Sequence, residues 1–337
     1  MRPRLIWGGC RVIGVSLGLL LSTVVNMSLL VMLCIGFTFT YMMEKFPNFA
    51  HTSLATLGTM VTFYLVRLRG LNPYLTWPLS ALVGGLAGIL LYQAVVKPLR
   101  GRPFSDITLT FTFYIVGQII SKALAVFSYW LLVVKKMQSQ GFNLYAYDTR
   151  LWGLPAISVA APLTVLTIVL LLQGFLKWSK HGVAMRATAE NEALAQGLGV
   201  DVGLMHIASW WISGSLAALS GSIVSMWLNT SVNYSDALIV NVMAGSVLGG
   251  LNSITGAILG GFLVAVGTKA LTWALISHLG VAMGAYEALI PIVFLFTILA
   301  IEPNGLTAID RTKLSKAHLR ESLRRLARTL RNVATTE

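Results

Sequence analysis

Two short stretches place polar side chains at the start of apolar segments. They are Asn48-Phe49-Ala50-His51-Thr52-Ser53 and Asn233-Tyr234-Ser235-Asp236, and in both an asparagine precedes an aromatic, a small and a polar residue. A helix that begins inside a membrane can turn the positive end of its dipole towards an anionic group of a solute. This chemistry predicts a translocation path lined by Asn48, Phe49, His51 and Asn233.

Each stretch also offers a side-chain cap to the helix that follows it. The expected caps are Thr52 or Ser53 in the first stretch and Ser235 or Asp236 in the second. Two such signals in two halves of one chain indicate an internal repeat with short or re-entrant helices, although so short a match also arises by chance. The alternative for His51 is an ordinary hydrogen-bonded residue at a helix start.

Residues suited to catalysis are not arranged for it. Cys10 and Cys34 lie in the first apolar region, as buried thiols do, and the five histidines show neither metal-ligand spacing nor paired acids nearby. The nearest approach to a phosphate-binding loop, Gly261 to Lys269, has the wrong spacing. We therefore expect no catalytic residue, no metal site, no cofactor and no enzymatic activity in this chain.

The composition indicates a membrane protein. Of 337 residues 56% are hydrophobic and 11% are charged, whereas soluble domains carry about 25% charged residues. Crossing a bilayer takes roughly 20 apolar residues, and uncharged runs of that length cover 12–43, 70–96, 151–176, 202–235 and 237–268. Because backbone groups in lipid must be paired internally, the runs predict an all-α polytopic transmembrane helix bundle of about 8–10 spans.

The formal net charge of +13 comes from loops and chain ends. Basic clusters at 2–11, 97–102 and 177–186 and in the tail are typical of cytoplasmic faces, so we expect contact with the lipid bilayer and not with nucleic acid. The prediction is a multi-pass protein of the plasma membrane with both termini cytoplasmic. This topology requires the run 12–43 to split into two spans near Asn26; otherwise the N-terminus lies outside or one segment re-enters.

The end of the chain forms a separate unit. Apolar residues recur there at helical spacing, at Leu319, Leu323, Leu326, Leu330 and Val333, with arginines between them. We predict a transmembrane domain at 1–307 and a basic amphipathic cytoplasmic tail at 308–337. The tail suits an anionic lipid surface, and the alternative is a basic tail with no specific partner.

Glycines recur between 245 and 261. Gly256 and Gly260 have the small-xxx-small spacing that lets membrane helices approach closely. Gly249 and Gly250 open a tight turn that should separate a short helix from the next span. We expect a role in helix packing for Gly249, Gly250, Gly256 and Gly260.

Residues 182–200 form a polar, helix-prone insert between apolar runs. Thr188 is expected to cap a short helix with Glu190 and Glu192 near its start, and Gly197 and Gly199 to end it. A slim helix of this kind fits a groove on a soluble partner. An inert cytoplasmic loop is the alternative.

The insert GVAMRATAENEALAQGLGV resembles the cytoplasmic coupling segment in the membrane subunits of branched-chain amino-acid ABC importers. It matches that family's pattern at Gly182, Arg186, Ala187, Ala189, Glu190, Asn191, Ala195 and Gly199. Four further stretches are similar to family elements in the same order: the N-F-A-H element at 48–51 and the segments 97–103, 247–256 and 302–306. The chain departs from the family pattern at Thr52, Asn252 and Thr255 and across 104–150, which puts the identity of the solute in doubt.

The resemblance implies a permease subunit that forms the path for branched-chain or related amino acids. It implies a second homologous permease, two cytoplasmic ATPase subunits and an external solute-binding protein as partners, with ATP used by the ATPases. The residues that would couple to the ATPases are Arg186, Ala189, Glu190, Asn191, Ala195 and Gly199. Polar amino acids, urea and short amides remain alternative solutes.

Two other classes share a glycine-rich build with many spans. A secondary transporter or facilitator would work without ATPases, but acids suited to ion coupling are few, chiefly Asp236 and Glu287. An intramembrane enzyme would need a polar catalytic pair within the spans, which the sequence does not offer. The permease reading is therefore preferred.

Overall fold

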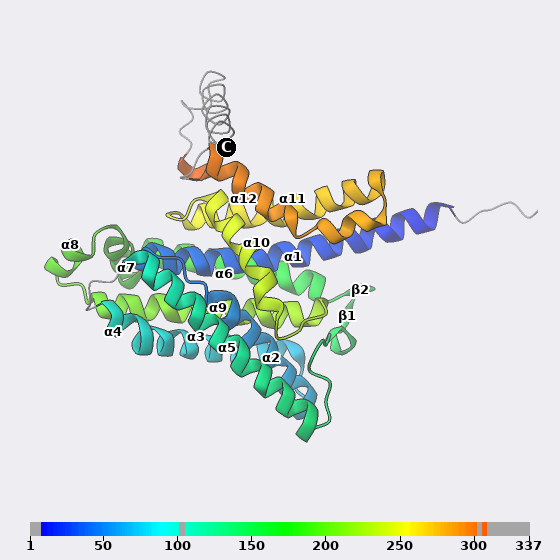
Figure 1. The fold of residues 1–337 in the computed structure, drawn as a ribbon, viewed down its shortest axis with the longest axis horizontal. Helices are drawn as coiled ribbons and strands as arrows, with labels where there is room; N and C mark the ends of the chain where they lie inside the picture. Colours follow the sequence, from blue (N-terminus) through cyan, green and yellow to red (C-terminus); the bar gives the residue numbers. More distant parts are fainter. Residues whose placement is uncertain (1–7, 101–104, 302–304, 309–337) are drawn as a thin grey trace, which may run out of the picture.

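The structure, a computed structural model, describes residues 8–100, 105–301 and 305–308, and these are helical almost throughout (Figure 1). The longer helices are α1 (Gly8–Glu44), α2 (His51–Arg69), α3 (Pro73–Leu91), α5 (Asp106–Val134), α6 (Ile157–Trp178), α9 (Val202–Trp227), α10 (Tyr234–Gly249), α11 (Ile254–Leu279) and α12 (Leu289–Ile301). The shorter elements are the π-helix η1 (Tyr92–Val96), α4 (Lys97–Arg100), η2 (Tyr145–Tyr147), β1 (Arg150–Leu151), β2 (Leu154–Pro155), α7 (Lys180–Glu190), α8 (Glu192–Gly197), η3 (Val281–Tyr286) and η4 (Leu306–Ala308).

Six of the described helices are long and apolar enough to cross a membrane. They are α1, the continuous unit from α3 to α4, α5, α6, α9 and α11, and the shorter apolar helices α10 and α12 lie among them. The predicted all-α polytopic bundle is thus confirmed, short helices included. The predicted basic tail falls almost wholly on residues 309–337, outside the described part.

The first helix differs from the expectation. α1 is unbroken, so the predicted split of the run 12–43 near Asn26 is wrong. Asn26 stays within the helix because its Nδ2 donates to the carbonyl oxygen of Ser22, one turn earlier, at 2.8 Å. The start of α1 consequently lies at the end of the bundle opposite α7 and α8 (Figure 1). The last described element, η4, is instead tied to the α10–α11 turn, where Thr307 Oγ1 donates to the carbonyl oxygen of Gly249 at 2.9 Å.

The helices form two sets with the same packing pattern. The first set is α1, α2, α3 and α5, and the second is α9, α10, α11 and α12. Each set contacts the first helix of the other set: α2 and α3 contact α9, and α10 and α11 contact α1. Within the sets, α5 packs on α2 in the same way that α12 packs on α10. Since α1 and α9 lie side by side and run in opposite directions (Figure 1), this is the pattern of an inverted-topology repeat.

Small residues allow the close approach between the sets. A Cβ added at Gly221 of α9 would lie 1.8 Å from the carbonyl oxygen of Ala55 in α2. One added at Gly214 would lie 2.2 Å from the carbonyl oxygen of Gly84 in α3. Lipid offers no hydrophobic drive for helices to associate, so such backbone contact supplies the packing that holds them together.

The glycines singled out in the sequence lie where α10 meets α11. A Cβ at Gly249 would come 1.9 Å from the carbonyl oxygen of Gly256, and one at Gly260 would come 2.0 Å from that of Gly245. Gly250 follows the end of α10 with φ +103°, a backbone region that favours glycine. The turn between the short helix and the next span therefore lies where the sequence placed it.

Candidate solute path and coupling surface

The chain returns into the bundle between α1 and α2. α2 starts beside the interior of α1, since His51 Nε2 lies 3.1 Å from the carbonyl oxygen of Leu33. The N-cap residues are Ala50 for α2 and Asn233 for α10, and neither helix start has a side-chain cap. The predicted caps are therefore wrong. The hydroxyl groups of Ser53 and Ser235 contact another helix instead; Ser53 Oγ, for example, donates to the carbonyl oxygen of Gly117 in α5 at 2.9 Å.

The two polar stretches meet on α5. Ser121 Oγ lies 3.2 Å from Ser53 Oγ at the start of α2 and 3.2 Å from Ser235 Oγ at the start of α10. One turn away on α5, Gln118 Nε2 donates to Asp236 Oδ1 at 3.3 Å. A small cavity opens here, lined by Phe49, Thr52, Ser53, Tyr114, Gly117, Gln118, Ser235, Asp236 and Ile239. Two helix N-termini and several polar side chains thus converge on one space within the apolar bundle.

The predicted path residues lie in different places relative to this cavity. Phe49 lines it. Asn48 and His51 are buried behind it, 1% and 0% exposed, and Asn233 is exposed but is not part of the lining. His51 connects three helices, because its Nδ1 also lies 3.1 Å from Ser213 Oγ of α9. The structure therefore brings together neighbours that the sequence did not single out, above all Ser121 and Gln118.

We expect His51→Ala to lower the free energy of unfolding by about 1–3 kcal/mol, because it removes two buried polar contacts and leaves a cavity. Thermal unfolding of the detergent-solubilised chain measures this, and Asn233→Ala, at an exposed position, should change it by less than about 0.5 kcal/mol. If His51→Ala unfolds like the unmodified chain yet changes solute uptake, the role in the path predicted from the sequence is the correct one.

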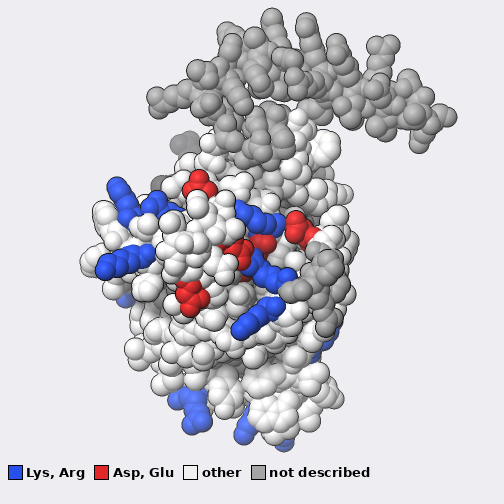
Figure 2. Space-filling view, turned by 90° about the vertical axis from the view of Figure 1, so that its left-hand side faces the viewer, with Lys and Arg blue, Asp and Glu red and all other residues white. Residues whose placement is uncertain are grey.

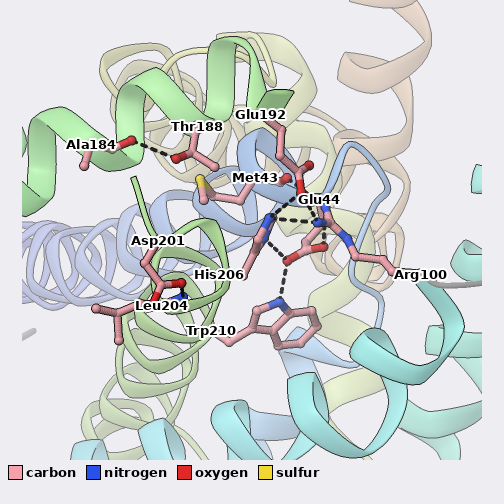
Figure 3. Close-up of polar contacts among 10 residues, drawn as sticks. All are labelled: Met43, Glu44, Arg100, Ala184, Thr188, Glu192, Asp201, Leu204, His206 and Trp210. Carbon is pink, nitrogen blue, oxygen red and sulfur yellow. Dashed lines mark hydrogen bonds and ion pairs between the residues drawn. The ribbon is translucent and has the colours of Figure 1, made fainter. Parts of the chain in front are cut away.

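The insert at 182–200 folds as two helices rather than one. Ser179 caps α7 by accepting a bond from the backbone N of Gly182 at 2.9 Å, so the expected cap at Thr188 is wrong. Thr188 Oγ1 donates instead to the carbonyl oxygen of Ala184 at 2.9 Å (Figure 3). Asn191 interrupts the helix, and its side chain caps α8 by accepting from Leu194 N at 3.0 Å. Gly199, with φ +84°, follows the end of α8.

The predicted coupling residues divide by exposure. Arg186, Glu190, Asn191 and Gly199 are exposed, whereas Ala189 and Ala195 are 9% and 1% exposed and pack inward. Two apolar side chains that the sequence reading passed over, Leu194 and Leu198, are 62% and 75% exposed. We define the α7–α8 surface as Arg186, Glu190, Leu194 and Leu198. Figure 2 looks onto this end of the bundle, where basic and acidic side chains gather on an otherwise mostly uncharged surface.

A buried polar network lies directly behind the α7–α8 surface (Figure 3). Glu44, the last residue of α1, accepts hydrogen bonds at Oε1 from His206 Nδ1 and Trp210 Nε1 of α9, both at 2.8 Å. Its Oε2 lies 3.0 Å from Arg100 Nη2 of α4. Arg100 Nη1 donates to Glu192 Oε1 of α8 at 3.0 Å and lies 2.8 Å from His206 Nε2. The contacts join α1, α4, α8 and α9 through side chains that sequence reading missed.

The hydrogen-bond partners indicate the roles of the two ring nitrogens of His206. The guanidinium of Arg100 can only donate, so Nε2 of His206 accepts from it, while Nδ1–H donates to Glu44. Arg100 then carries the positive charge between the carboxylates of Glu44 and Glu192. Among the described residues no group of His, Cys, Asp and Glu side chains is arranged to hold a metal ion.

The sequence was compared with those of known protein families and proteins. Residues 19–300 match the family described as "Branched-chain amino acid transport system / permease component". A "Probable branched-chain amino acid transport permease protein LivH" of Methanocaldococcus jannaschii is 31% identical over 295 residues, covering 88% of this chain and 93% of that protein. The "High-affinity branched-chain amino acid transport system permease protein LivH" of Escherichia coli strain K12 is 22% identical, covering 82% of this chain and 90% of that protein.

A "Tyrosine transport system permease protein" of Clostridioides difficile is 22% identical, covering 70% of this chain and 71% of that protein. The family match spans nearly the whole described bundle, from α1 to α12. The chain belongs to the permease-component family of branched-chain amino-acid transport systems.

Proposed function

We propose that this chain is the membrane half of an ATP-driven importer of branched-chain or related amino acids in the plasma membrane. Its partners would be a second homologous permease, two cytoplasmic ATPase subunits and an external solute-binding protein. The observation that carries the proposal is the α7–α8 surface, an exposed pair of short helices set on the buried network at one end of the bundle (Figures 1 and 3).

The contacts explain how motion at this surface could reach the solute path. Glu192 on α8 binds Arg100, which binds Glu44 at the end of α1. Directly after Glu44 the chain turns back to Phe49, which lines the cavity on α5. An ATPase that displaced α8 would therefore pull on a short polar chain ending at the path. Coupling requires contacts that differ between two states of the transporter, and ion pairs across helices can exchange in this way.

We place the α7–α8 end in the cytoplasm. Lys97, Arg100, Lys177 and Lys180 lie at this end, as expected for an inner face. With this orientation the start of α1 lies outside, whereas η4 lies on the inside, because the α10–α11 turn that it contacts borders α7. The proposal thus keeps a cytoplasmic basic tail but gives up the expectation that both termini are cytoplasmic.

Reconstitution tests the function. The chain would be co-purified with its membrane and ATPase partners, placed in proteoliposomes with the binding protein, and assayed for uptake of radiolabelled L-leucine and L-tyrosine. We expect uptake only with ATP on the ATPase side. Equal uptake without ATP would show a secondary transporter or facilitator instead.

The α7–α8 surface carries a prediction of its own. Leu198→Asp should weaken co-purification of the ATPase subunits and lower uptake at least tenfold, because Leu198 is 75% exposed and a carboxylate cannot enter an apolar groove without a large desolvation cost. The control is Leu163→Asn, which is 60% exposed and lies in the half of α6 further from α7, and it should leave ATPase co-purification unchanged. Normal ATPase co-purification with Leu198→Asp would remove α8 from the docking surface.

A further inference from the structure

Lys122 is a charged residue in the middle of a membrane-spanning helix. It lies between Asp106 and Val134, the ends of α5, so about 18–24 Å of helix extends on either side of it at roughly 1.5 Å per residue. Its side chain is exposed, and the ion pairs of the described residues do not include it. Its neighbours on the exposed face are apolar, among them Ile115, Val126 and Tyr129.

An exposed lysine in the middle of a membrane-spanning helix is energetically unfavourable in contact with lipid. Placing it at the centre of a spanning helix is energetically costly even when the side chain can reach towards the interface. Membrane-embedded charges that persist face a protein partner or a water-filled path. The face of α5 around Lys122 is therefore covered by something more polar than lipid.

The cavity on α5 supplies the second observation. Gln118 lies one helical turn before Lys122 and so shares its side of the helix. Gln118 Nε2 donates to Asp236 Oδ1 at 3.3 Å, which holds this carboxylate at the edge of the cavity. Asp236 is also exposed. An exposed cation thus lies one helical turn along α5 from the residue that holds an exposed anion, and the ion pairs of the described residues do not join the two.

We propose that Lys122 and Asp236 bind the two charged ends of a zwitterionic amino acid during transport. Lys122 takes the α-carboxylate and Asp236 takes the α-ammonium, with Gln118 positioning Asp236. Phe49, Tyr114 and Ile239 of the cavity lining offer apolar contact to the solute's side chain. The inference rests on the proposed function and adds to it the residues that bind the charged groups of the solute.

The test uses the reconstituted complex described above and radiolabelled L-leucine. Lys122→Gln should lower ATP-driven uptake at least tenfold, Lys122→Arg should retain most of it, and Asp236→Asn should lower it at least tenfold. The matched control is Lys135→Gln, which removes an exposed charge just after the end of the same helix and should leave uptake unchanged. All variants should co-purify with the second permease, so that a loss of uptake is not a loss of assembly, and Lys135→Gln should also hydrolyse ATP at the basal rate of the unmodified complex.

Accessibility gives a readout that does not depend on ATP. In a chain whose two cysteines are replaced by alanine, Lys122→Cys should react with a charged, membrane-impermeant thiol reagent. Leu171→Cys, on the exposed apolar face of α6, should not react.

The possible results distinguish failure of the proposed site from failure of the proposed importer function. Normal uptake with Lys122→Gln, or an unreactive Lys122→Cys, would overturn the proposed site. Loss of the second permease from purified Lys122→Gln would show that Lys122 pairs with that subunit, which also overturns it. An unmodified complex that moves leucine without ATP would instead refute the importer function, while a reactive Lys122→Cys and loss of uptake in Lys122→Gln would still support the site.

Discussion

Glu44→Ala should lower the free energy of unfolding by about 3–5 kcal/mol, the range seen when one partner of a buried ion pair is removed. The Glu44 side chain is 1% exposed and its carboxylate meets three groups: the guanidinium of Arg100, the imidazole of His206 and the indole N–H of Trp210. Alanine leaves His206 Nδ1 and Trp210 without their acceptor and leaves Arg100 with Glu192 as its remaining carboxylate partner. The ends of α1, α4 and α9 would then lose their shared contact.

The size of the effect follows from burial. Trp210 is 0% exposed and His206 is 1% exposed, so water cannot replace the lost carboxylate. Glu44→Gln should be milder, because the amide oxygen still accepts from His206 and Trp210, although its NH2 group then faces the guanidinium of Arg100, which also only donates. The measurement is thermal or denaturant-induced unfolding of the purified chain in detergent.

Glu190→Ala is the matched control, since it removes an exposed carboxylate at the same end of the bundle and should change the free energy of unfolding by less than about 0.5 kcal/mol. Should Glu44→Ala unfold with the same midpoint as Glu190→Ala, the network would be no more than a surface contact. Such a result would also weaken the proposed link between α8 and α1.

Much of the fold could be predicted from the sequence because a membrane-spanning helix is marked by a local feature, a long run of uncharged residues. Uncharged runs predicted the spans, and the glycines at 249–260 marked the α10–α11 contact. The stretches at 48–53 and 233–236 were flagged by their residue types alone. What stayed hidden was that they meet, because the meeting point, Ser121, lies on a third helix with no local signal.

The errors have a common physical cause. Ser53, Ser235 and Thr188 were expected to cap helices, yet the first two hydroxyls bond to α5 and the third bonds within its own helix. A hydroxyl near a helix start is equally suited to either use, and only the neighbouring helix decides. The unbroken α1 has a similar cause. The residues of the run 12–43 do not show where in the bundle the chain after Glu44 begins its next helix, so they could not decide between one helix and two.

The network behind the α7–α8 surface was missed for a different reason. His206 and Glu44 are 162 positions apart, and no motif spacing connects them. One signal was available: Glu44 is an acid that closes a long apolar run, and a buried acid needs partners. Its partners could be found only from the packing of α9 against α1.

Glu192→Arg should abolish most transport while leaving the fold intact. Uptake of L-leucine should fall at least tenfold, because the new guanidinium would stand beside Arg100 and His206 and push α8 away from α4 instead of holding it. Folded stability should change little, since the Glu192 side chain is 48% exposed and surface ion pairs contribute only about 0–1 kcal/mol. ATP hydrolysis by the associated ATPases should persist, so that the ratio of solute moved to ATP consumed collapses.

Three further variants isolate the cause. Glu192→Gln keeps an acceptor for Arg100 and should retain a large part of uptake. Ala193→Arg adds the same cation to α8 at an exposed position, one residue after Glu192 and therefore on a different side of the helix, so uptake should stay near normal; if it fell as far as in Glu192→Arg, added charge on α8 would explain the loss. Adding Arg100→Glu to Glu192→Arg should not rescue transport. Arg100 serves two carboxylates at once, so the exchange restores the contact with α8 only by setting a second carboxylate against the buried Glu44.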